Sequence, residues 1–204
     1  MSLMTACLRG HLETASALLA TGAAVDQVSG EAHNTPLYAA CHLEVASMLL
    51  AAGAAVDQAR PDGTIPLYIA CQKGHLEWAS MLLAADMPVD QAWPGGATPL
   101  HIACQNGHLE VLASMLLAAG AAVDQARPDG VTPLLIACQY GHLAVASALL
   151  AAGAAVDQVS AEAHVTPLYA AFQNGRLEVA SMLLAAGAAV DQARPDGTIP
   201  LYIA

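Results

Sequence analysis

The sequence predicts an all-α solenoid in which short helix-turn-helix units stack on one another. Three observations support this prediction. A unit of about 33 residues recurs along the chain. Each copy opens with a polar turn that is often rich in Pro, Asp and Gly, and then shows two short apolar stretches with helical spacing. Helices of about ten residues are marginal alone in water, so each pair of helices needs the next pair to bury its apolar faces.

The most regular copy, Asp124–Val156, shows how each part of the unit is expected to fold. Its turn, Asp124–Gly130, contains Pro to fix φ, Asp to bond its own backbone and Gly to accept a positive φ. Thr132-Pro133 can then cap and begin a first helix, which Gly141 is suited to end. A second helix is expected over His142–Ala152, where Leu, Val and Ala form an apolar stripe.

These residues resemble the ankyrin repeat. The family motif T-P-L-H-x-A stands in full at Thr98–Ala103, it is followed by Gly107-His108, and Leu116–Ala121 matches the L-L-x-x-G-A ending. Such motifs recur along essentially the whole chain. The resemblance implies stacked helix-turn-helix units joined by hairpin-like turns, and it implies a protein partner.

One array is expected to span residues 1–204. It divides into a partial repeat at 1–25, repeats at 26–56, 57–89, 90–123, 124–156 and 157–190, and a partial repeat at 191–204. The repeat 26–56 lacks three residues, including the glycine that ends the first helix elsewhere. Its first helix is expected to shorten by about a turn rather than fuse with the second, because a fused helix would leave two apolar faces unstacked. The repeat 90–123 carries one extra residue, expected inside its second helix near Leu112.

Two departures from the family pattern concern the turns. The His of T-P-L-H braces the turn by hydrogen bonds in ankyrin repeats, and here it survives only as His101. Ile65 and Ile199 replace the Thr that caps the first helix, at a cost of about 0.5–2 kcal/mol each. Both changes are expected to affect the rigidity of single turns and to leave the fold intact.

Composition and charge exclude several classes of function. Apolar residues make up 56% of the chain and charged residues only 11%, so a core is easily formed. The net charge is −11, and Lys73 is the single lysine. This balance argues against nucleic acid as a partner, because phosphate binding needs clustered Lys and Arg.

Neither a membrane span nor a signal peptide is expected. The residues between Asp129 and Asp157 are uncharged over more than the roughly 20 residues that cross a bilayer, but they include Pro133 and Gln139 at their repeat positions. Ala15–Val25 is apolar, yet it follows no basic stretch and matches a second helix of the repeat. We therefore expect a cytoplasmic or nuclear protein.

The cysteines share one position of the unit, in the first helix. Stacked helices lie about 8–10 Å apart, whereas a disulfide needs Cα atoms about 4.4–6.8 Å apart. Buried free thiols in a reducing compartment are therefore expected, without disulfides or a shared metal. The five residues are Cys7, Cys41, Cys71, Cys104 and Cys138.

The sequence suggests no catalytic, cofactor-binding or metal site, and we expect a protein that is not an enzyme. Histidines recur after the turn glycine, as His11, His75, His108 and His142, but a spacing of about 8–10 Å is too long for one metal to bridge. His75 and Glu77 lie two residues apart on a helix and do not face each other.

The resemblance implies instead a protein-binding site on the concave face, formed by turn tips and the exposed side of the first helices. The matching positions are Arg60, Thr64, Gln72, Lys73, Trp93, Gln105, Asn106, Arg127, Gln139 and Tyr140, followed by Gln173 and Asn174 in the next repeat.

Trp93 is the most distinctive of these residues, since its siblings Arg60, Arg127 and Arg194 are all arginines. Trp and Arg are enriched among the residues that dominate binding energy. The alternative interpretation is that Trp93 only packs across its own turn.

Two other functions stay open from the sequence. The chain can be a regulatory or targeting segment of a larger protein. It can also be a structural element that associates with itself, because neither end shows the polar capping repeat that solenoids use.

Overall fold

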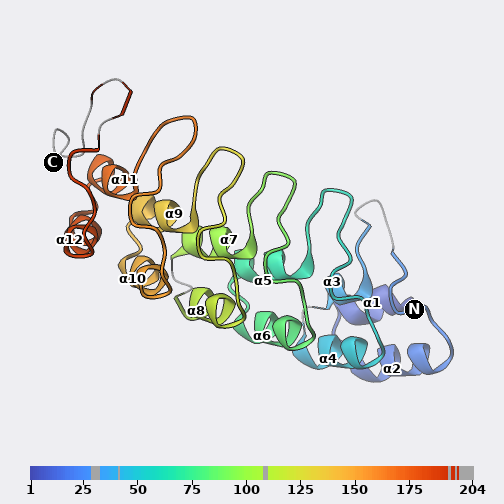
Figure 1. The fold of residues 1–204 in the computed structure, drawn as a ribbon. Coiled ribbons are helices and arrows are strands. Elements are labelled where there is room, and N and C mark those ends of the chain that lie inside the picture. Colours follow the sequence, from blue (N-terminus) through green and yellow to red (C-terminus); the bar gives the residue numbers. More distant parts are fainter. Residues whose placement is uncertain (29–32, 41, 108–109, 193, 196, 198–204) are drawn as a thin grey trace. The chain divides into compact units, whose positions relative to one another are not determined.

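The computed structural model describes residues 1–204 except 29–32, 41, 108–109, 193, 196 and 198–204. In the described residues, twelve α-helices follow one another in pairs (Figure 1). The chain divides into two compact units, Met1–Pro88 and Val89–Ala204, and each is described by itself. The expectation that all repeats form one array stays a prediction.

The first unit contains three helix pairs. Among the first helices α1 contacts α3, and among the second helices α4 contacts both α2 and α6. The pairs are α1 (Leu3–Leu8) with α2 (Leu12–Ala20), α3 (Pro36–Ala39) with α4 (Leu43–Ala51), and α5 (Pro66–Lys73) with α6 (Leu76–Ala84).

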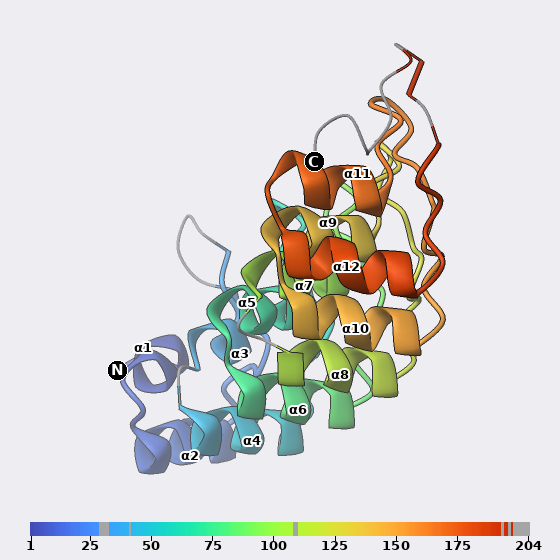
Figure 2. The ribbon, with the colours of Figure 1, turned by 90° about the vertical axis from the view of Figure 1, so that its left-hand side faces the viewer.

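The second unit repeats this arrangement. Helix α9 packs between α7 and α11, and α10 packs between α8 and α12, so first and second helices form two layers (Figures 1 and 2). The hairpin turns project beyond the layer of first helices. The pairs are α7 (Pro99–Asn106) with α8 (Glu110–Ala118), α9 (Pro133–Tyr140) with α10 (Leu143–Ala151), and α11 (Pro167–Gln173) with α12 (Leu177–Ala185).

Threonine and proline start the first helices as the sequence predicts. In four repeats the Thr hydroxyl accepts a hydrogen bond from the backbone N–H three residues on, while Pro fills the first helical position. Ile65 stands at the same position before α5 and makes no such bond, which confirms the predicted loss of that cap. The capping residues are Thr35, Thr98, Thr132 and Thr166.

Leucine and alanine fill the space between the layers. Leu100, Leu134 and Leu168 of the first helices are fully buried, as are Leu116 and Leu149 of the second helices. A fully buried Leu contributes about 1.5–3 kcal/mol relative to an exposed one. Stacking therefore supplies the stability that the short helices lack individually.

The shortened repeat keeps two separate helices. Helix α3 has four residues where α5 has eight, and α4 then begins at Leu43. The prediction that the first helix shortens rather than fuses is thus confirmed. Contacts of α3 with α1 and of α4 with α2 and α6 preserve the stack around it.

The extra residue of the repeat 90–123 lies ahead of Leu112. Leu112 and Leu116 are buried in α8 as Val145 and Leu149 are in α10, so the two helices keep the same register from Leu112 onward. Residues 108–109 lie outside the described residues. The prediction that the insertion lies inside the second helix therefore stays a prediction.

An aspartate at the start of a repeat binds the turn that follows the second helix of the same repeat. Asp124 accepts the backbone N–H of Ala155 at 3.0 and 3.1 Å. Asp57 cannot make this bond, because the matching residue is Pro88, which has no N–H. The other bonds of this kind are Asp26 with Ala55, Asp90 with Ala122, and Asp157 with Ala189.

Candidate functional site

Trp93 and Arg127 occupy equivalent places at the tips of successive hairpin turns in the second unit. The Trp93 N–H donates to the carbonyl of Ala97 at 2.9 Å, and the Arg127 N–H donates to that of Val131 at 3.0 Å. A glycine N–H then closes each turn onto the carbonyl of the tip residue, at 2.7 and 2.8 Å. The repeat thus presents either side chain on one backbone frame.

Adjacent tips are packed closely enough to require glycine. Gly130 has φ 77°, and a Cβ at this position would collide with the backbone nitrogen of Ala161 in the next turn. The Ala161 N–H also donates to the carbonyl of Asp129 at 2.8 Å. Backbone contact between turns therefore fixes the spacing of the residues that the tips display.

The two tip side chains differ in how they are held. Arg127 donates from Nη2 to Asp129 Oδ2 at 2.7 Å, with 36% of its side chain exposed. Trp93 keeps 38% of its surface exposed, which is unusual for a Trp. The tips therefore offer an oriented guanidinium and a large apolar ring.

His101 joins the first helix α7 to the next turn. Its Nδ1 accepts the Thr98 N–H at 3.2 Å and lies 2.8 Å from the Thr98 hydroxyl. Nδ1 therefore carries no proton, and Nε2–H donates to the carbonyl of Val131 at 3.1 Å. Burial lowers the pKa of His101, which keeps the ring neutral. The bracing role that the resemblance implies is confirmed.

Behind the tips, the ends of the first helices expose uncharged polar side chains. Gln105, Gln139 and Tyr140 are exposed and Asn106 is partly exposed. The Tyr140 ring stacks on the imidazole of His142 with ring centroids 6.0 Å apart. Amides and a phenol in this arrangement can donate and accept hydrogen bonds but carry no charge.

The histidine at the start of α10 has a structural role. His142 Nε2 lies 3.1 Å from the carbonyl of Gln105, and its ring covers Gly107, where a Cβ would collide with it. This contact supports the packing role proposed for the recurrent histidines. His108 lies outside the described residues.

A hollow of about 380 Å³ lies between the repeats of α9 and α11. Gln139 lines it, together with Gln173 and Asn174 at matching positions of the next repeat. Ser160 and Val165, from the longer turn, line it too and were not among the predicted site residues. Val165 precedes Thr166 as Val131 precedes Thr132, so the repeat pattern could have indicated it, whereas Ser160 has no counterpart of the same type in the shorter turns.

In the first unit, Arg60 heads a turn of the same form, with its N–H bonded to the carbonyl of Thr64 at 2.9 Å. Its guanidinium lies 3.7 Å from Asp62 and 5.8 Å from the ring centre of Tyr38. Gln72 and Lys73 are exposed at the end of α5. Thr64 is only 6% exposed, so its predicted place on the binding surface is wrong: it supports the turn from inside.

The cysteines described by the structure, Cys7, Cys71, Cys104 and Cys138, are buried free thiols, as predicted, whereas Cys41 lies outside the described residues. Burial raises the pKa of Cys71 and Cys138 to about 12. Among the described residues, no group of three or more His, Cys, Asp or Glu side chains is placed to hold a metal ion. In the same part of the chain, no helix is both long and apolar enough to cross a membrane.

Comparison with known proteins agrees with the repeat pattern. The family model described as ankyrin repeats matches three stretches, residues 1–60, 42–125 and 112–194. Among solved structures, the human ASB11 ankyrin repeat domain is 30% identical to this chain, with a TM-score of 0.85. The match covers 100% of this chain and 91% of that domain. No curated protein sequence matches the chain significantly.

Proposed function

Because the chain belongs to the ankyrin-repeat family, whose repeats are a general protein-interaction module, we propose that it holds a protein partner on its hairpin tips and first helices, without catalysing a reaction. In the second unit this surface consists of Trp93, Gln105, Asn106, Arg127, Gln139 and Tyr140, which we call the tip surface. Arg60, Gln72 and Lys73 are the corresponding residues of the first unit. We place the protein in the cytoplasm or nucleus, where its buried free thiols would stay reduced.

The observation that carries this proposal is Trp93. A Trp with 38% of its surface exposed stands where the sibling tips carry Arg, on a turn whose backbone bonds are the same. The turn therefore does not need the indole for its own geometry. An exposed ring on a rigid frame loses little conformational entropy on binding, which favours it as an anchor for a partner.

The rest of the tip surface indicates the kind of partner. Gln105, Gln139 and Tyr140 offer hydrogen bonds without charge, and Arg127 offers one oriented cation paired with Asp129. Such a surface fits a folded protein that presents polar groups around an apolar patch. It fits a polyanion poorly, because the whole chain carries a net charge of −11.

The experiment begins with affinity capture and mass spectrometry to identify a partner, followed by calorimetry with the purified pair. Trp93→Arg keeps the side chain used by the sibling turns, and Arg127→Ala removes the neighbouring anchor. Each is expected to weaken binding about thirtyfold, the loss typical of an interface anchor. Thermal unfolding should change little in either variant. Arg127→Ala removes one surface ion pair, which contributes about 0–1 kcal/mol, and Trp93→Arg introduces the side chain that the sibling turns carry.

Two controls remove exposed side chains from the layer of second helices in the same unit. Leu177→Ala deletes an apolar side chain that is 63% exposed, and Glu110→Ala deletes a charge. Both should bind the partner as the unchanged protein does. Weakened binding in the controls with normal binding in the tip variants would move the site to the second helices. If the captured partner is another copy of the chain, light scattering over a concentration range will show self-association instead.

A further inference from the structure

The shortened helix α3 leaves space that the following repeat only partly fills. Residues that would form the last turn of α3 are missing, so this helix ends at Ala39. The next repeat places Trp78 in α6 against this region, where the matching positions of α4, α10 and α12 carry Val45, Val145 and Val179. The one Trp on a second helix thus follows the one repeat with the deletion.

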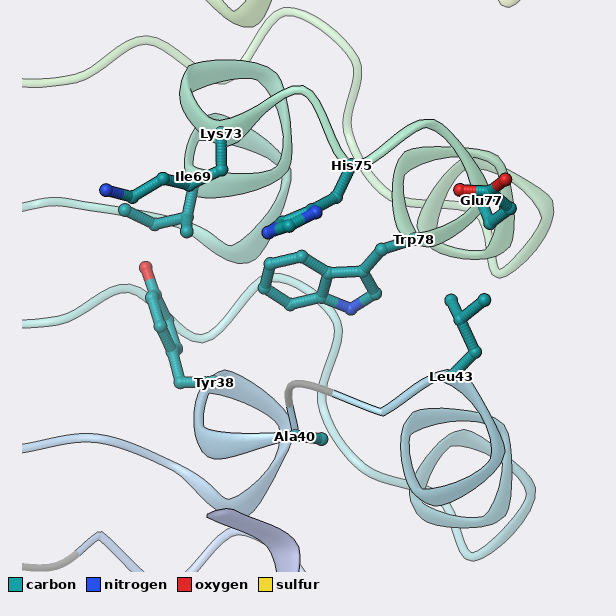
Figure 3. Close-up of a pocket in the computed structure, with 8 residues that line it drawn as sticks. All are labelled: Tyr38, Ala40, Leu43, Ile69, Lys73, His75, Glu77 and Trp78. Atoms are coloured by element: carbon teal, nitrogen blue, oxygen red, sulfur yellow. The ribbon is translucent and has the colours of Figure 1, made fainter. Parts of the chain in front are cut away.

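Trp78 does not close this space completely. A cavity of about 370 Å³ remains within the first unit, between α3, the start of α4, α5 and α6 (Figure 3). This volume falls within the range of about 300–1,000 Å³ that small-molecule sites occupy. Ala40, Leu43 and the Trp78 ring give it apolar walls (Figure 3).

Two buried polar atoms at this cavity have no hydrogen-bond partner, namely Trp78 Nε1 and the Tyr38 hydroxyl. Trp78 is only 7% exposed, so water does not satisfy its N–H from the surface. Figure 3 shows the indole nitrogen directed to the side of Ala40 and Leu43, and the Tyr38 hydroxyl directed to the side of Ile69 and Lys73. A buried donor without an acceptor costs free energy that a ligand can recover.

Charge is distributed unevenly around the cavity. Lys73, the single lysine of the chain, lies on the side of the Tyr38 hydroxyl, whereas the Glu77 carboxylate lies beyond the opposite end of the indole (Figure 3). The His75 ring lies against the indole, with ring centroids 6.4 Å apart. One end of the cavity therefore favours an anion, and the other offers a neutral donor.

We propose that this cavity is a binding site for a small planar carboxylic acid that carries a hydrogen-bonding group at the end opposite its carboxylate. The carboxylate lies at Lys73 and accepts from the Tyr38 hydroxyl. The planar body lies against Trp78, Ala40 and Leu43, and the distal group accepts the indole N–H. Every buried polar atom that the protein leaves unpaired here then has a partner.

The test uses p-coumarate, which is planar and has a carboxylate and a phenol at opposite ends, and cinnamate, which lacks only the phenol. The chain has two tryptophans, so proton–nitrogen NMR shows two indole N–H signals, and Trp93→Arg identifies that of Trp78. We expect p-coumarate to shift the Trp78 signal saturably and leave the Trp93 signal in place. Cinnamate should bind roughly tenfold more weakly, as the loss of one buried hydrogen bond predicts.

Two variants test the contacts separately. Trp78→Phe keeps an aromatic wall but removes the donor, so it should bind the two acids equally. Lys73→Met should weaken both acids several-fold, because it removes the cation and retains the length of the side chain. Circular dichroism of each variant confirms its helices before binding is measured.

The proposal is overturned if the Trp78 signal does not move in the unchanged protein, or if both indole signals move together as in nonspecific surface binding. Equal affinity of the unchanged protein for the two acids would also overturn it, because the indole N–H would then contribute nothing. Both measurements are made on the unchanged protein, and only the assignment of the two indole signals uses a variant, Trp93→Arg. They therefore stand even if Trp78→Phe or Lys73→Met fails to fold.

Discussion

Replacing His101 with Leu tests whether the single histidine of the T-P-L-H motif stabilises the turn of the following repeat, which ends at Val131. The sibling residue Leu135 shows that this fold accepts Leu at the position. The change removes the bond from Nε2 to the carbonyl of Val131 and the bond that Thr98 N–H donates to Nδ1. Each bond contributes about 0.5–1.5 kcal/mol, and the buried Thr98 N–H is left without a partner. The apolar burial of Leu offsets part of this, so we expect a net loss of about 2 kcal/mol.

Urea unfolding monitored by circular dichroism measures this loss, because the α-helices of the repeats dominate the signal. The reciprocal change, Leu135→His, is the matched comparison. It places a His beside Thr132 and one repeat before Val165, whose position matches that of Val131. Leu135→His should therefore raise the free energy of unfolding by part of the amount that His101→Leu removes. A loss below about 0.5 kcal/mol, within the range of ordinary surface substitutions, would refute the bracing role of His101.

The same bonds predict how the loss depends on pH. Burial lowers the pKa of His101 in the folded state, whereas in the unfolded chain it stays near 6.5. The unfolded state therefore binds a proton first as pH falls. The contribution of His101 to stability is complete above about pH 6.5 and declines as pH drops toward the lowered pKa. The difference in unfolding free energy between the unchanged protein and His101→Leu should narrow over this interval, and a difference that widens would contradict the neutral, bracing ring.

Two further predictions concern the stack itself. Asp124→Ala should lower the free energy of unfolding by about 1 kcal/mol, because it breaks the bond to the Ala155 N–H. Asp57→Ala should cost less than half as much, because Pro88 has no N–H to donate. Equal losses for the two variants in urea unfolding would contradict this account. Cys104 is fully buried, and burial raises its pKa, so a thiol reagent should label it only at the rate at which the repeat opens. Labelling is followed by mass spectrometry, and rapid labelling of the folded protein would show that Cys104 is not packed inside the first-helix layer.

The sequence was sufficient to predict most of the fold because every unit repeats the same local signals. Thr132 caps α9, Pro133 begins it and Gly141 ends it in the left-handed conformation, as their residue types require. A helix of this length is stable only in a stack, so the period also predicts the packing. The shortening of α3 followed from the same reasoning.

The surface and the cavity could be predicted only in part, because they depend on how successive repeats differ. The repeat pattern predicts that Arg127 lies at a turn tip and Gln139 near the end of the first helix behind it. It does not predict the ion pair of Arg127 with Asp129, which depends on side-chain rotamers. The pattern predicts Thr64 on the binding surface of the first unit, whereas the structure buries it. Only a few residues separate the exposed turn tip, Arg60, from the buried start of α5, so the repeat pattern alone does not show where exposure ends. The sequence alone could not show which residue of the repeat 90–123 takes the buried position, because Val111 and Leu112 are both apolar; the structure buries Leu112 and leaves Val111 58% exposed.

The two tryptophans show where specificity arises in a chain made of repeats. Residues that recur at each position, such as the capping Thr and the buried Leu, are explained fully by stacking and cannot distinguish one ligand from another. Trp93 replaces an Arg at a tip without altering the turn, and Trp78 replaces a Val beside a helix that has lost a turn. Each adds a large ring and an indole donor at a single place in the chain. The proposed partner at the tips and the proposed ligand in the cavity each depend on one of these departures. A variant that restores the repeat residue, Trp93→Arg or Trp78→Val, should therefore weaken the corresponding binding strongly while the stack persists.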